Sequence, residues 1–351
     1  MNNNTYVIVM AGGIGSRFWP LSTPEKPKQF LDILHCGQTM LQQTVSRISS
    51  ICPDENILIV TSEHYRSIVQ EQLPQLSHSQ ILFEPCMRNT APCIAYACWK
   101  INKINPEAQL IVLPSDQYVG NTDAFLSSIK TSLAYLKDHN TVVTLGIPPT
   151  EPATGYGYIQ AATKKQLKEN EIVPVADFKE KPDRPTAINY LLSGNYFWNA
   201  GIFIGKGSTF REAFHTYLPV MAEQFNSITA ALYTEKEQQA VNELYPQCEN
   251  ISVDYGILEK LSAIAIVKTA FEWSDLGAWN ALHQREDKDE QNNSEGHAKL
   301  VHTKNCLLHL PPEVDALIQG VEDLIIVFHN NKLLISHKNM EQQIKENSKK
   351  N

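Results

Sequence analysis

Near its start the sequence places a short apolar run directly before a glycine-rich turn. Residues 6–10 read Tyr-Val-Ile-Val-Met, and a run so rich in β-branched residues predicts a buried strand. Residues 12–15 read Gly-Gly-Ile-Gly, and glycine lets the backbone turn sharply and approach a ligand closely. Because successive backbone N–H groups in such a turn can bind an anion, the two features together indicate a phosphate-binding loop at the end of a strand.

Basic residues after the turn favour phosphate binding over a tight turn without a ligand. Glycine patterns are loose, so the turn alone leaves both interpretations open. Arg17 adds a fixed fork of donors that suits phosphate oxygens, and Lys26 and Lys28 add mobile positive charges.

Two familiar glycine loops fit this sequence poorly. A P-loop ends in Gly-Lys-Ser/Thr, whereas Gly15 is followed by Ser16 and Arg17. A dinucleotide-binding turn opens a helix and has a third glycine where Phe18 stands. Prolines within residues 20–27 also prevent a long helix from starting there, so an NAD-dependent oxidoreductase is disfavoured.

Strand and helix patterns alternate along the first part of the chain. The strand candidates are residues 57–61, 110–113 and 141–147, and the helix candidates are residues 39–50, 65–73, 91–104 and 122–139. Such alternation predicts an α/β fold with a Rossmann-like mixed, mostly parallel sheet flanked by helices. In such sheets ligands bind beyond the carboxyl ends of the strands, where we expect the glycine turn and Asp116.

The second half of the chain has a looser pattern and then a small all-β segment. Further strands are predicted at 156–160, 175–178 and 201–204, and helices at 210–233 and 236–244. The predicted parts are a large domain over 1–284, a linker over 285–297, a short truncated β-helix-like domain over 298–338 and a polar tail over 339–351. This C-terminal β appendage packs either on the core or against a second subunit, and the sequence leaves a homodimer open.

Composition excludes several protein classes. The formal net charge of −8 disfavours a nucleic-acid partner, since such partners require a basic face. The 7 cysteines form no Cys-x-x-Cys pair, so neither a disulfide framework nor a zinc site is indicated. No apolar stretch approaches membrane-spanning length, and the N-terminal run lacks the basic segment of a signal peptide. We therefore expect a cytoplasmic protein with no membrane partner.

Two aspartates stand where a metal ion could be held. Asp116 follows the predicted strand 110–113, and Asp275 lies between two tryptophans and close to a glycine. Taken singly, each is more often a loop or helix-capping residue. Together with a phosphate loop, the pair predicts a shared Mg²⁺ site, because phosphoryl chemistry usually needs a metal.

Other polar motifs could contact a second substrate. Residues 180–182 read Glu-Lys-Pro, which suits a hydroxyl pair and a phosphate, although a solvated strand end is the simpler alternative. Asn199 could bridge sugar hydroxyls or form a turn. Residues 154–158 read Thr-Gly-Tyr-Gly-Tyr, which allows a close backbone approach or a β-bulge. Residues 88–92 resemble a helix start, near which Glu84 could meet a base edge.

Taken in order, these motifs resemble those of the mannose-1-phosphate guanylyltransferases, also called GDP-mannose pyrophosphorylases, within the sugar-phosphate nucleotidyltransferases. The resemblance runs from Tyr6 to about Leu282 and continues more weakly through the β appendage. It implies that the first predicted domain is the nucleotidyltransferase catalytic domain. The segments that carry it are 11–20, 27–30, 84–92, 114–116, 154–158, 178–182, 198–199, 254–256 and 273–275.

The resemblance implies a role for each matching residue. The nucleotide-binding residues would be Gly12, Gly13, Gly15, Arg17, Glu84 and Asn89. The residues that bind the sugar phosphate would be Gly155, Glu180, Lys181, Asn199 and Asp254. The catalytic residues would be Arg17, Lys28 and Lys181. The Mg²⁺ ligands would be Asp116 and Asp275.

The chain departs from the family pattern in three respects. Gln117 stands where the family usually has a histidine, and Ala153 stands where a glutamate often precedes Thr-Gly-Tyr-Gly. Both differences could shift substrate preference, but neither removes a proposed metal ligand. Longer relatives continue into a cupin-like phosphomannose isomerase domain, so isomerase activity is not expected here.

The resemblance implies Mg²⁺-dependent transfer of GMP from GTP to α-D-mannose 1-phosphate, giving GDP-mannose for glycan synthesis. Sequence alone leaves open the same chemistry on another sugar 1-phosphate, such as a heptose or glucose, or with another nucleotide. A catalytically inactive nucleotide-sugar sensor is the alternative from a different class. The joint presence of Arg17, Lys28, Asp116, Lys181 and Asp275 argues against a sensor, which has no need of both carboxylates.

Overall fold

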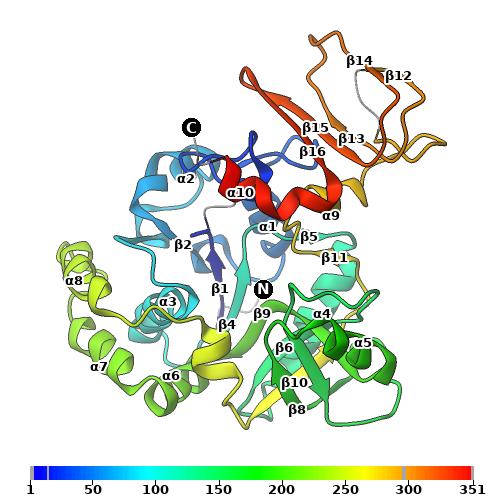
Figure 1. Cartoon of the computed structure of the whole chain (residues 1–351). Helices are drawn as coiled ribbons and strands as arrows, with labels where there is room; N and C mark the ends of the chain where they lie inside the picture. Colours follow the sequence, from blue (N-terminus) through cyan, green and yellow to red (C-terminus); the bar gives the residue numbers. More distant parts are fainter. Residues whose placement is uncertain (1–3, 14–15, 295–297, 349–351) are drawn as a thin grey trace. The chain divides into compact units, whose positions relative to one another are not determined.

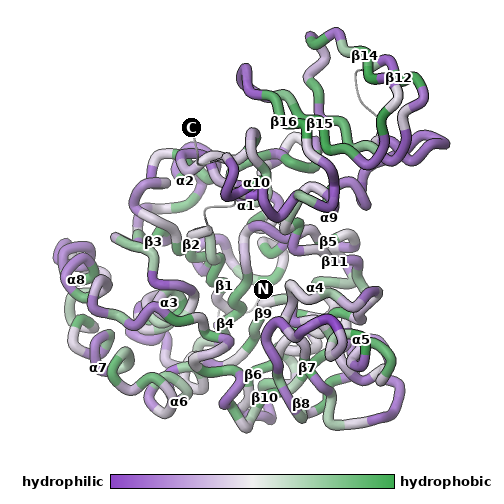
Figure 2. Tube along the Cα trace, in the orientation of Figure 1, coloured by the Kyte–Doolittle hydropathy of each residue, from purple (hydrophilic) through white to green (hydrophobic). Residues whose placement is uncertain are grey.

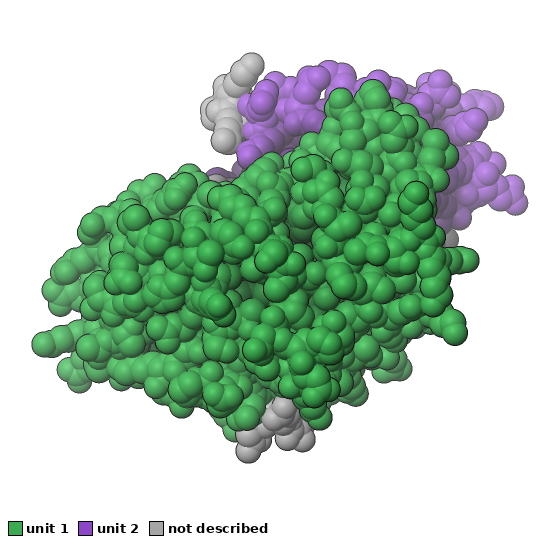
Figure 3. All heavy atoms as spheres, turned by 90° about the horizontal axis from the view of Figure 1, so that it is seen from below, with its two compact units in different colours: residues 1–12, 42–115, 119–273 green, residues 13–41, 116–118, 274–351 purple. Residues whose placement is uncertain are grey.

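The chain folds into two compact units, shown in Figure 3, and the computed structural model describes residues 4–13, 16–294 and 298–348. Unit 1 comprises residues 1–12, 42–115 and 119–273, and unit 2 comprises residues 13–41, 116–118 and 274–351. Two short strands, β5 (Tyr118–Val119) and β11 (Trp273–Ser274), contain unit boundaries. Gly15, one of the predicted nucleotide-binding residues, lies outside the described residues. The domain boundaries expected from the sequence stay a prediction.

Unit 1 is built on a mixed sheet (Figure 1). Its strands, in spatial order, are β3 (Ile81–Glu84), β2 (Ile57–Ser62), β1 (Thr5–Met10), β4 (Gln109–Pro114), β9 (Tyr196–Lys206), β6 (Val142–Ile147), β10 (Ile264–Lys268), β8 (Ile172–Lys179) and β7 (Tyr158–Ala161). The pairs β3–β2, β2–β1, β1–β4 and β6–β10 are parallel, and every antiparallel pair in this described sheet includes β7, β8 or β9. The predicted α/β class with a mixed sheet is confirmed.

The parallel register brings two predicted site segments to one edge of the sheet. Met10 pairs with Pro114, and the Ser115 N–H donates to the Met10 carbonyl at 3.0 Å. The glycine turn and Ser115 therefore both begin where parallel strands end, as expected for ligand-binding loops. On the other side of β1, Ser62 of β2 pairs with Glu84 at the end of β3.

The helices of unit 1 follow the predicted periodic segments, with two exceptions: the helix Arg184–Ser193 was not predicted, and one predicted helix is divided in two. They are α1 (Met40–Ile48), which begins in unit 2, α2 (Arg66–Gln72), α3 (Thr90–Ile104), α4 (Thr122–Tyr135), α5 (Arg184–Ser193), α6 (Gly207–Tyr217), α7 (Pro219–Ile228) and α8 (Glu237–Leu244). The single helix predicted over 210–233 is wrong: α6 ends before Leu218 and α7 begins at Pro219. Proline lacks the N–H needed inside a helix and suits a first helical position.

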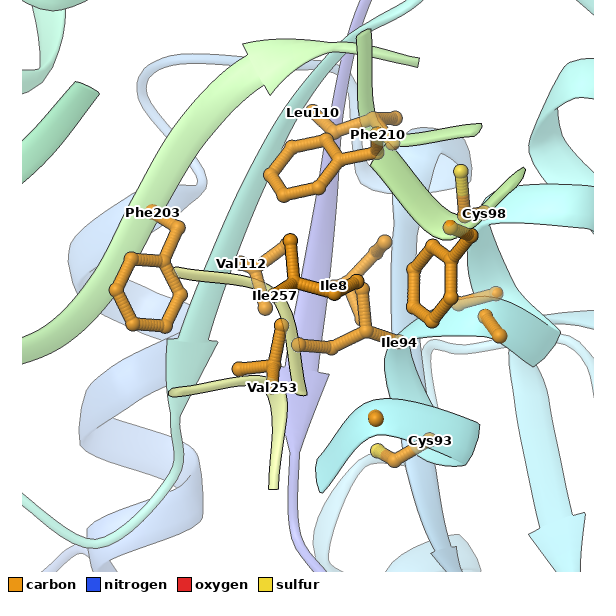
Figure 4. Close-up of a cluster of buried hydrophobic side chains, with 14 of the residues drawn as sticks. Ile8, Cys93, Ile94, Cys98, Leu110, Val112, Phe203, Phe210, Val253 and Ile257 are labelled. Carbon is orange, nitrogen blue, oxygen red and sulfur yellow. The ribbon is translucent and has the colours of Figure 1, made fainter. Parts of the chain in front are cut away.

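A continuous hydrophobic core covers one face of this sheet, as the close-up in Figure 4 shows. Ile8 of β1 and Val112 of β4 are fully buried, and Ile94 of α3 packs into the same cluster. Phe203 and Phe210 join it from β9 and α6. In Figure 2, β1 and β4 carry hydrophobic colour, which is the pattern expected for strands covered by helices.

Unit 2 contains the β appendage. Its strands are β12 (Lys299–Val301), β13 (Leu307–His309), β14 (Leu317–Gln319), β15 (Leu324–His329) and β16 (Lys332–His337), and its helices are α9 (Trp279–His283) and α10 (Ile344–Asn347). Lys299 pairs in parallel with Leu317, and Leu307 pairs in parallel with Ile325 at the same sequence offset. A constant offset between parallel strands is typical of one coil of a β-solenoid.

A separate hydrophobic cluster stabilises unit 2. The rings of Phe18 and Trp279 pack in a tilted arrangement with centroids 5.0 Å apart, and Leu276, Leu307 and Ile325 are fully buried beside them. The residues around the metal-site candidate Asp275 are therefore part of this core.

Within the described residues, no helix is both long and apolar enough to cross a membrane.

Candidate active site

In unit 2, Lys28 binds both segments that carry the predicted metal ligands. Its side chain is only 5% exposed, and its ammonium nitrogen lies 3.0 Å from Oδ2 of Asp116. The same nitrogen donates to the main-chain carbonyls of Asp275 at 2.6 Å and Leu276 at 3.0 Å. Pro27 precedes a single 3-10 turn, Lys28–Phe30, that fixes where this side chain begins. One buried cation thus joins sequence segments that are far apart.

The two carboxylates are held by short local turns. Asp116 comes directly after β4 and Ser115, and its side chain is 39% exposed. Oδ1 of Asp275 accepts from the Gly277 N–H at 2.9 Å. A Cβ at Gly277 would lie 2.7 Å from Oδ2 of Asp275, so a side chain at this position would displace the Asp275 carboxylate.

This donor set suits a hard divalent cation rather than a transition metal. The described residues contain no group of three or more histidine, cysteine, aspartate or glutamate side chains able to hold a metal. Mg²⁺ usually takes one or two carboxylates and completes its shell with water and substrate phosphates. Asp116 and Asp275 fit that requirement.

The described part of the glycine turn is hydrogen-bonded to the segment that contains Lys28. The Gln29 side-chain amide donates to the Gly13 carbonyl at 2.8 Å, and Gln29 lies beside Lys28 in the 3-10 turn. Arg17 is exposed in the next short turn, Ser16–Phe18. An exposed guanidinium close to backbone N–H groups of a glycine turn can bind an anion.

In unit 1, four predicted sugar-phosphate residues form a second polar group. Lys181 pairs with Oε1 of Glu180 at 2.5 Å, and Glu180 is only 10% exposed while Lys181 is 57% exposed. The Asn199 amide donates to Oδ1 of Asp254 at 2.9 Å, and its own oxygen accepts from the Gly201 N–H. Asp254 begins a short π-helical turn, Asp254–Leu258.

Gly157, which sequence reasoning did not select, is the glycine that packs into this group. A Cβ there would collide with Oε2 of Glu180 and lie 3.3 Å from Cβ of Asn199. The predicted residue Gly155 is exposed, and a Cβ on it would meet no atom within 4 Å. The alternation of glycine and tyrosine in residues 154–158 points equally to Gly155 and Gly157. Only their packing in the structure distinguishes the two glycines.

Electrostatics single out Asp254 in this group. Burial and the nearby charge of Glu180 raise its pKa to about 6, although the hydrogen bond from Asn199 and the charge of Lys181 lower it. Burial lowers the pKa of Lys181, but the hydrogen bond and charge of Glu180 outweigh it, so the net direction is upward. The group therefore holds a charged, exposed lysine beside two partly buried carboxyls, which suits a phosphate and neighbouring hydroxyls.

A third feature of unit 1 surrounds Glu84. This side chain is 7% exposed, and Oε1 accepts a short hydrogen bond from the Tyr245 hydroxyl. A Cβ on Gly12 would lie 3.0 Å from Oε2 of Glu84, so the carboxylate sits against the first residue of the glycine turn. Asn89 is exposed at the start of α3, where its side chain accepts from the Thr90 N–H at 3.0 Å.

Two cavities of unit 2 have no predicted site residue in their lining. One of about 380 Å³ is lined by Trp19, Leu334 and Ile344 among others. Another of about 810 Å³ is lined by His35, Glu286 and His309 among others. The polar groups described above, unlike these cavities, bring together the charged residues that phosphate chemistry needs.

Known proteins match this chain over most of its length. The family model described as nucleotidyl transferase matches residues 6–292. A mannose-1-phosphate guanylyltransferase of Klebsiella pneumoniae is 36% identical over 96% of this chain and 72% of its own length. The alginate biosynthesis protein AlgA of Pseudomonas aeruginosa is 34% identical over 96% of this chain and 70% of its own length. A crystal structure described as mannose-1-phosphate geranyltransferase from Thermus thermophilus has a TM-score of 0.88 and 31% identity, covering 99% of this chain and 98% of that one.

Proposed function

Because the chain belongs to the nucleotidyl transferase family, we propose that it transfers GMP from GTP to α-D-mannose 1-phosphate, forming GDP-mannose and pyrophosphate. The likeness to mannose-1-phosphate guanylyltransferases over 96% of the chain supports this substrate pair. The observation that carries the chemistry is the Lys28 contact with Asp116 and the Asp275 segment, because it gathers the charges that triphosphate chemistry requires.

The triphosphate is the proposed ligand of the glycine turn. Backbone N–H groups of Gly12, Gly13 and Gly15 bind its oxygens, and the Arg17 guanidinium adds charge-assisted hydrogen bonds. Asp116 and Asp275 would hold Mg²⁺, which neutralises phosphate charge when bound. Lys28 keeps the segments of both aspartates in place from its buried position.

The sugar phosphate is the proposed ligand of the second polar group. The exposed Lys181 ammonium binds the phosphate, and Glu180 and Asp254 accept hydrogen bonds from sugar hydroxyls. Asn199 both holds Asp254 and offers its amide to a hydroxyl. Gly155 and Gly157 allow the backbone of this loop to approach the sugar closely.

The proposed reaction is an in-line displacement at the α-phosphorus of GTP. A phosphate oxygen of mannose 1-phosphate forms the new P–O bond, the bond to the bridging oxygen of the β-phosphate breaks, and pyrophosphate leaves with that electron pair. The nucleophile is already ionised near neutral pH, so no general base is required. Catalysis then depends on positioning and charge neutralisation.

Guanine is the proposed partner of Glu84 and Asn89. An ionised carboxylate only accepts hydrogen bonds, and guanine offers two adjacent donors, N1–H and the exocyclic amino group.

We also place the enzyme in the cytoplasm, a location supported by seven cysteines that are all free.

The decisive experiment measures product and pyrophosphate with a panel of substrates. The purified protein is incubated with Mg²⁺, each nucleoside triphosphate and mannose, glucose and heptose 1-phosphates, with chelator as control. Activity with GTP and mannose 1-phosphate, lost with chelator, is the expected result. Preference for another pair would correct the substrates, and binding of a nucleotide sugar without turnover of any pair would favour a sensor.

A further inference from the structure

The buried carboxylate of Glu84 has one oxygen that is held and one that faces the glycine turn. Oε1 accepts from the hydroxyl of Tyr245, which is fully buried in a short 3-10 turn, Tyr245–Gln247. Arg88 fixes this turn, because its guanidinium donates to the Pro246 carbonyl at 2.5 Å. Oε2 lies against Gly12. The Tyr245 hydroxyl therefore holds one oxygen of the Glu84 carboxylate, and the other oxygen faces Gly12.

No described lysine or arginine forms an ion pair with Glu84. The ionisable groups that face it are the hydroxyl of Tyr245 and the thiol of Cys93, and Cys248 lies next to Tyr245. Burial raises the pKa of both thiols, so they remain neutral near pH 7. Burial is therefore the main influence on how readily Glu84 loses its proton, and the Tyr245 hydroxyl is the neighbouring group that opposes it.

We propose that Tyr245 is a positioning residue for nucleobase choice: its hydroxyl orients Glu84 and favours the carboxylate form, so that Oε2 accepts hydrogen bonds from guanine. This inference rests on the proposed use of GTP. An ionised carboxylate matches the two donors of guanine, whereas a protonated carboxyl has one donor and one acceptor, which matches the edge of adenine. The protonation state of Glu84 therefore selects the base.

The environment of Glu84 makes the preference for guanine over adenine depend on pH near neutrality. Burial raises its pKa to about 7, and the hydrogen bond from Tyr245 lowers it. When the hydroxyl is removed, the pKa rises further, and a larger fraction of Glu84 is protonated at pH 7. GTP affinity should then fall at neutral pH and recover at higher pH, while discrimination against ATP becomes weaker.

The test measures equilibrium binding of GTP and ATP to Tyr245→Phe from about pH 6 to about pH 8.5. Because a higher pKa leaves less of Glu84 ionised at neutral pH, we expect GTP affinity to fall several-fold near pH 7 and by less at about pH 8.5. The midpoint of the pH profile should move upward, and kcat at saturating GTP should change little. Glu84→Gln should abolish the pH dependence, which gives a second measurement if Tyr245→Phe folds poorly.

Tyr96→Phe is the matched control, because Tyr96 is also buried and donates to a carboxylate, Oε1 of Glu237, at 2.7 Å. This variant should lose similar stability but keep the wild-type pH profile and base preference. An unchanged pH midpoint and ATP discrimination in Tyr245→Phe would overturn the proposal, as would a wild-type protein with no preference for GTP. A wild-type protein that binds GTP with the expected pH profile but forms no GDP-mannose would instead overturn the proposed reaction.

Discussion

The ammonium nitrogen of Lys28 lies 3.0 Å from Oδ2 of Asp116, and the lysine is almost completely buried while the aspartate is partly exposed. The same nitrogen also binds the backbone beside Asp275. A lysine in this position offsets the negative charge of Asp116 and fixes the loops that carry the two carboxylates. It therefore links the stability of unit 2 to the assembly of the proposed metal site.

Lys28→Met should destabilise the protein and reduce turnover together. The methionine fills similar space but leaves the carbonyls of Asp275 and Leu276 without their donor. An unsatisfied buried carbonyl costs about 1–3 kcal/mol, so urea denaturation should show a loss of at least that size. Lys28→Arg should restore little, since a planar guanidinium cannot replace a compact ammonium. Wild-type stability in Lys28→Met would contradict this role.

Asp116→Asn and Asp275→Asn should each lower turnover by roughly 10²–10⁴-fold with little loss of stability. The asparagine oxygen can still accept from Lys28 at position 116 and from the Gly277 N–H at position 275. The negative charge that attracts Mg²⁺ is lost. Pyrophosphate release should be measured against Mg²⁺ concentration, and near-normal release by both variants would refute the metal assignment.

Gly157→Ala should raise KM for the sugar phosphate by about tenfold or more while changing KM for GTP little. A Cβ at this position collides with the Glu180 carboxylate and presses on Asn199. Gly155→Ala is the comparison, since the same methyl group there meets no atom within 4 Å and should have a smaller effect. Equal effects of the two substitutions would show that Gly157 has no special packing role.

The pKa of Asp254 predicts a stability change with pH. Its value is raised from 3.8 to about 6, so between these values the folded protein holds the proton more tightly than the unfolded chain. This contribution to stability is present at low pH and is lost as the pH rises through about 6. Relative to wild type, Asp254→Asn should therefore gain up to about 3 kcal/mol between about pH 4 and about pH 7.

Urea denaturation at several pH values checks this difference. Asp183→Asn is a control of opposite sign, because hydrogen bonds from Thr186 lower the pKa of Asp183. A wild-type and Asp254→Asn difference that stays constant with pH would contradict the titration of Asp254. Sugar-phosphate turnover should fall in Asp254→Asn even where its stability increases.

Local patterns predicted the elements of this fold well, because apolar periodicity and glycine turns act over a few residues. The strand at 6–10 and the α/β sheet follow from such signals, whereas the prediction of one helix over 210–233 missed the break at Pro219. The contacts of Lys28 and Tyr245 could not be predicted from the sequence. Each depends on partners more than 80 residues away, and no spacing rule connects them. Gly155 and Gly157 look equivalent in sequence, and only tertiary packing distinguishes them.

Backbone conformation at Lys181 gives the last prediction. Its φ of 47° lies in the left-handed region, which costs a non-glycine residue about 1 kcal/mol or more. Strained backbone of this kind is frequent at ligand-binding positions, which agrees with the proposed role of Lys181 as a phosphate ligand. Lys181→Gly should therefore be more stable than Lys181→Ala by about 1 kcal/mol, although both lose the ammonium and should raise KM for the sugar phosphate equally. Urea denaturation and steady-state kinetics on the two variants separate the effects, and equal stabilities would show that this conformation carries no strain.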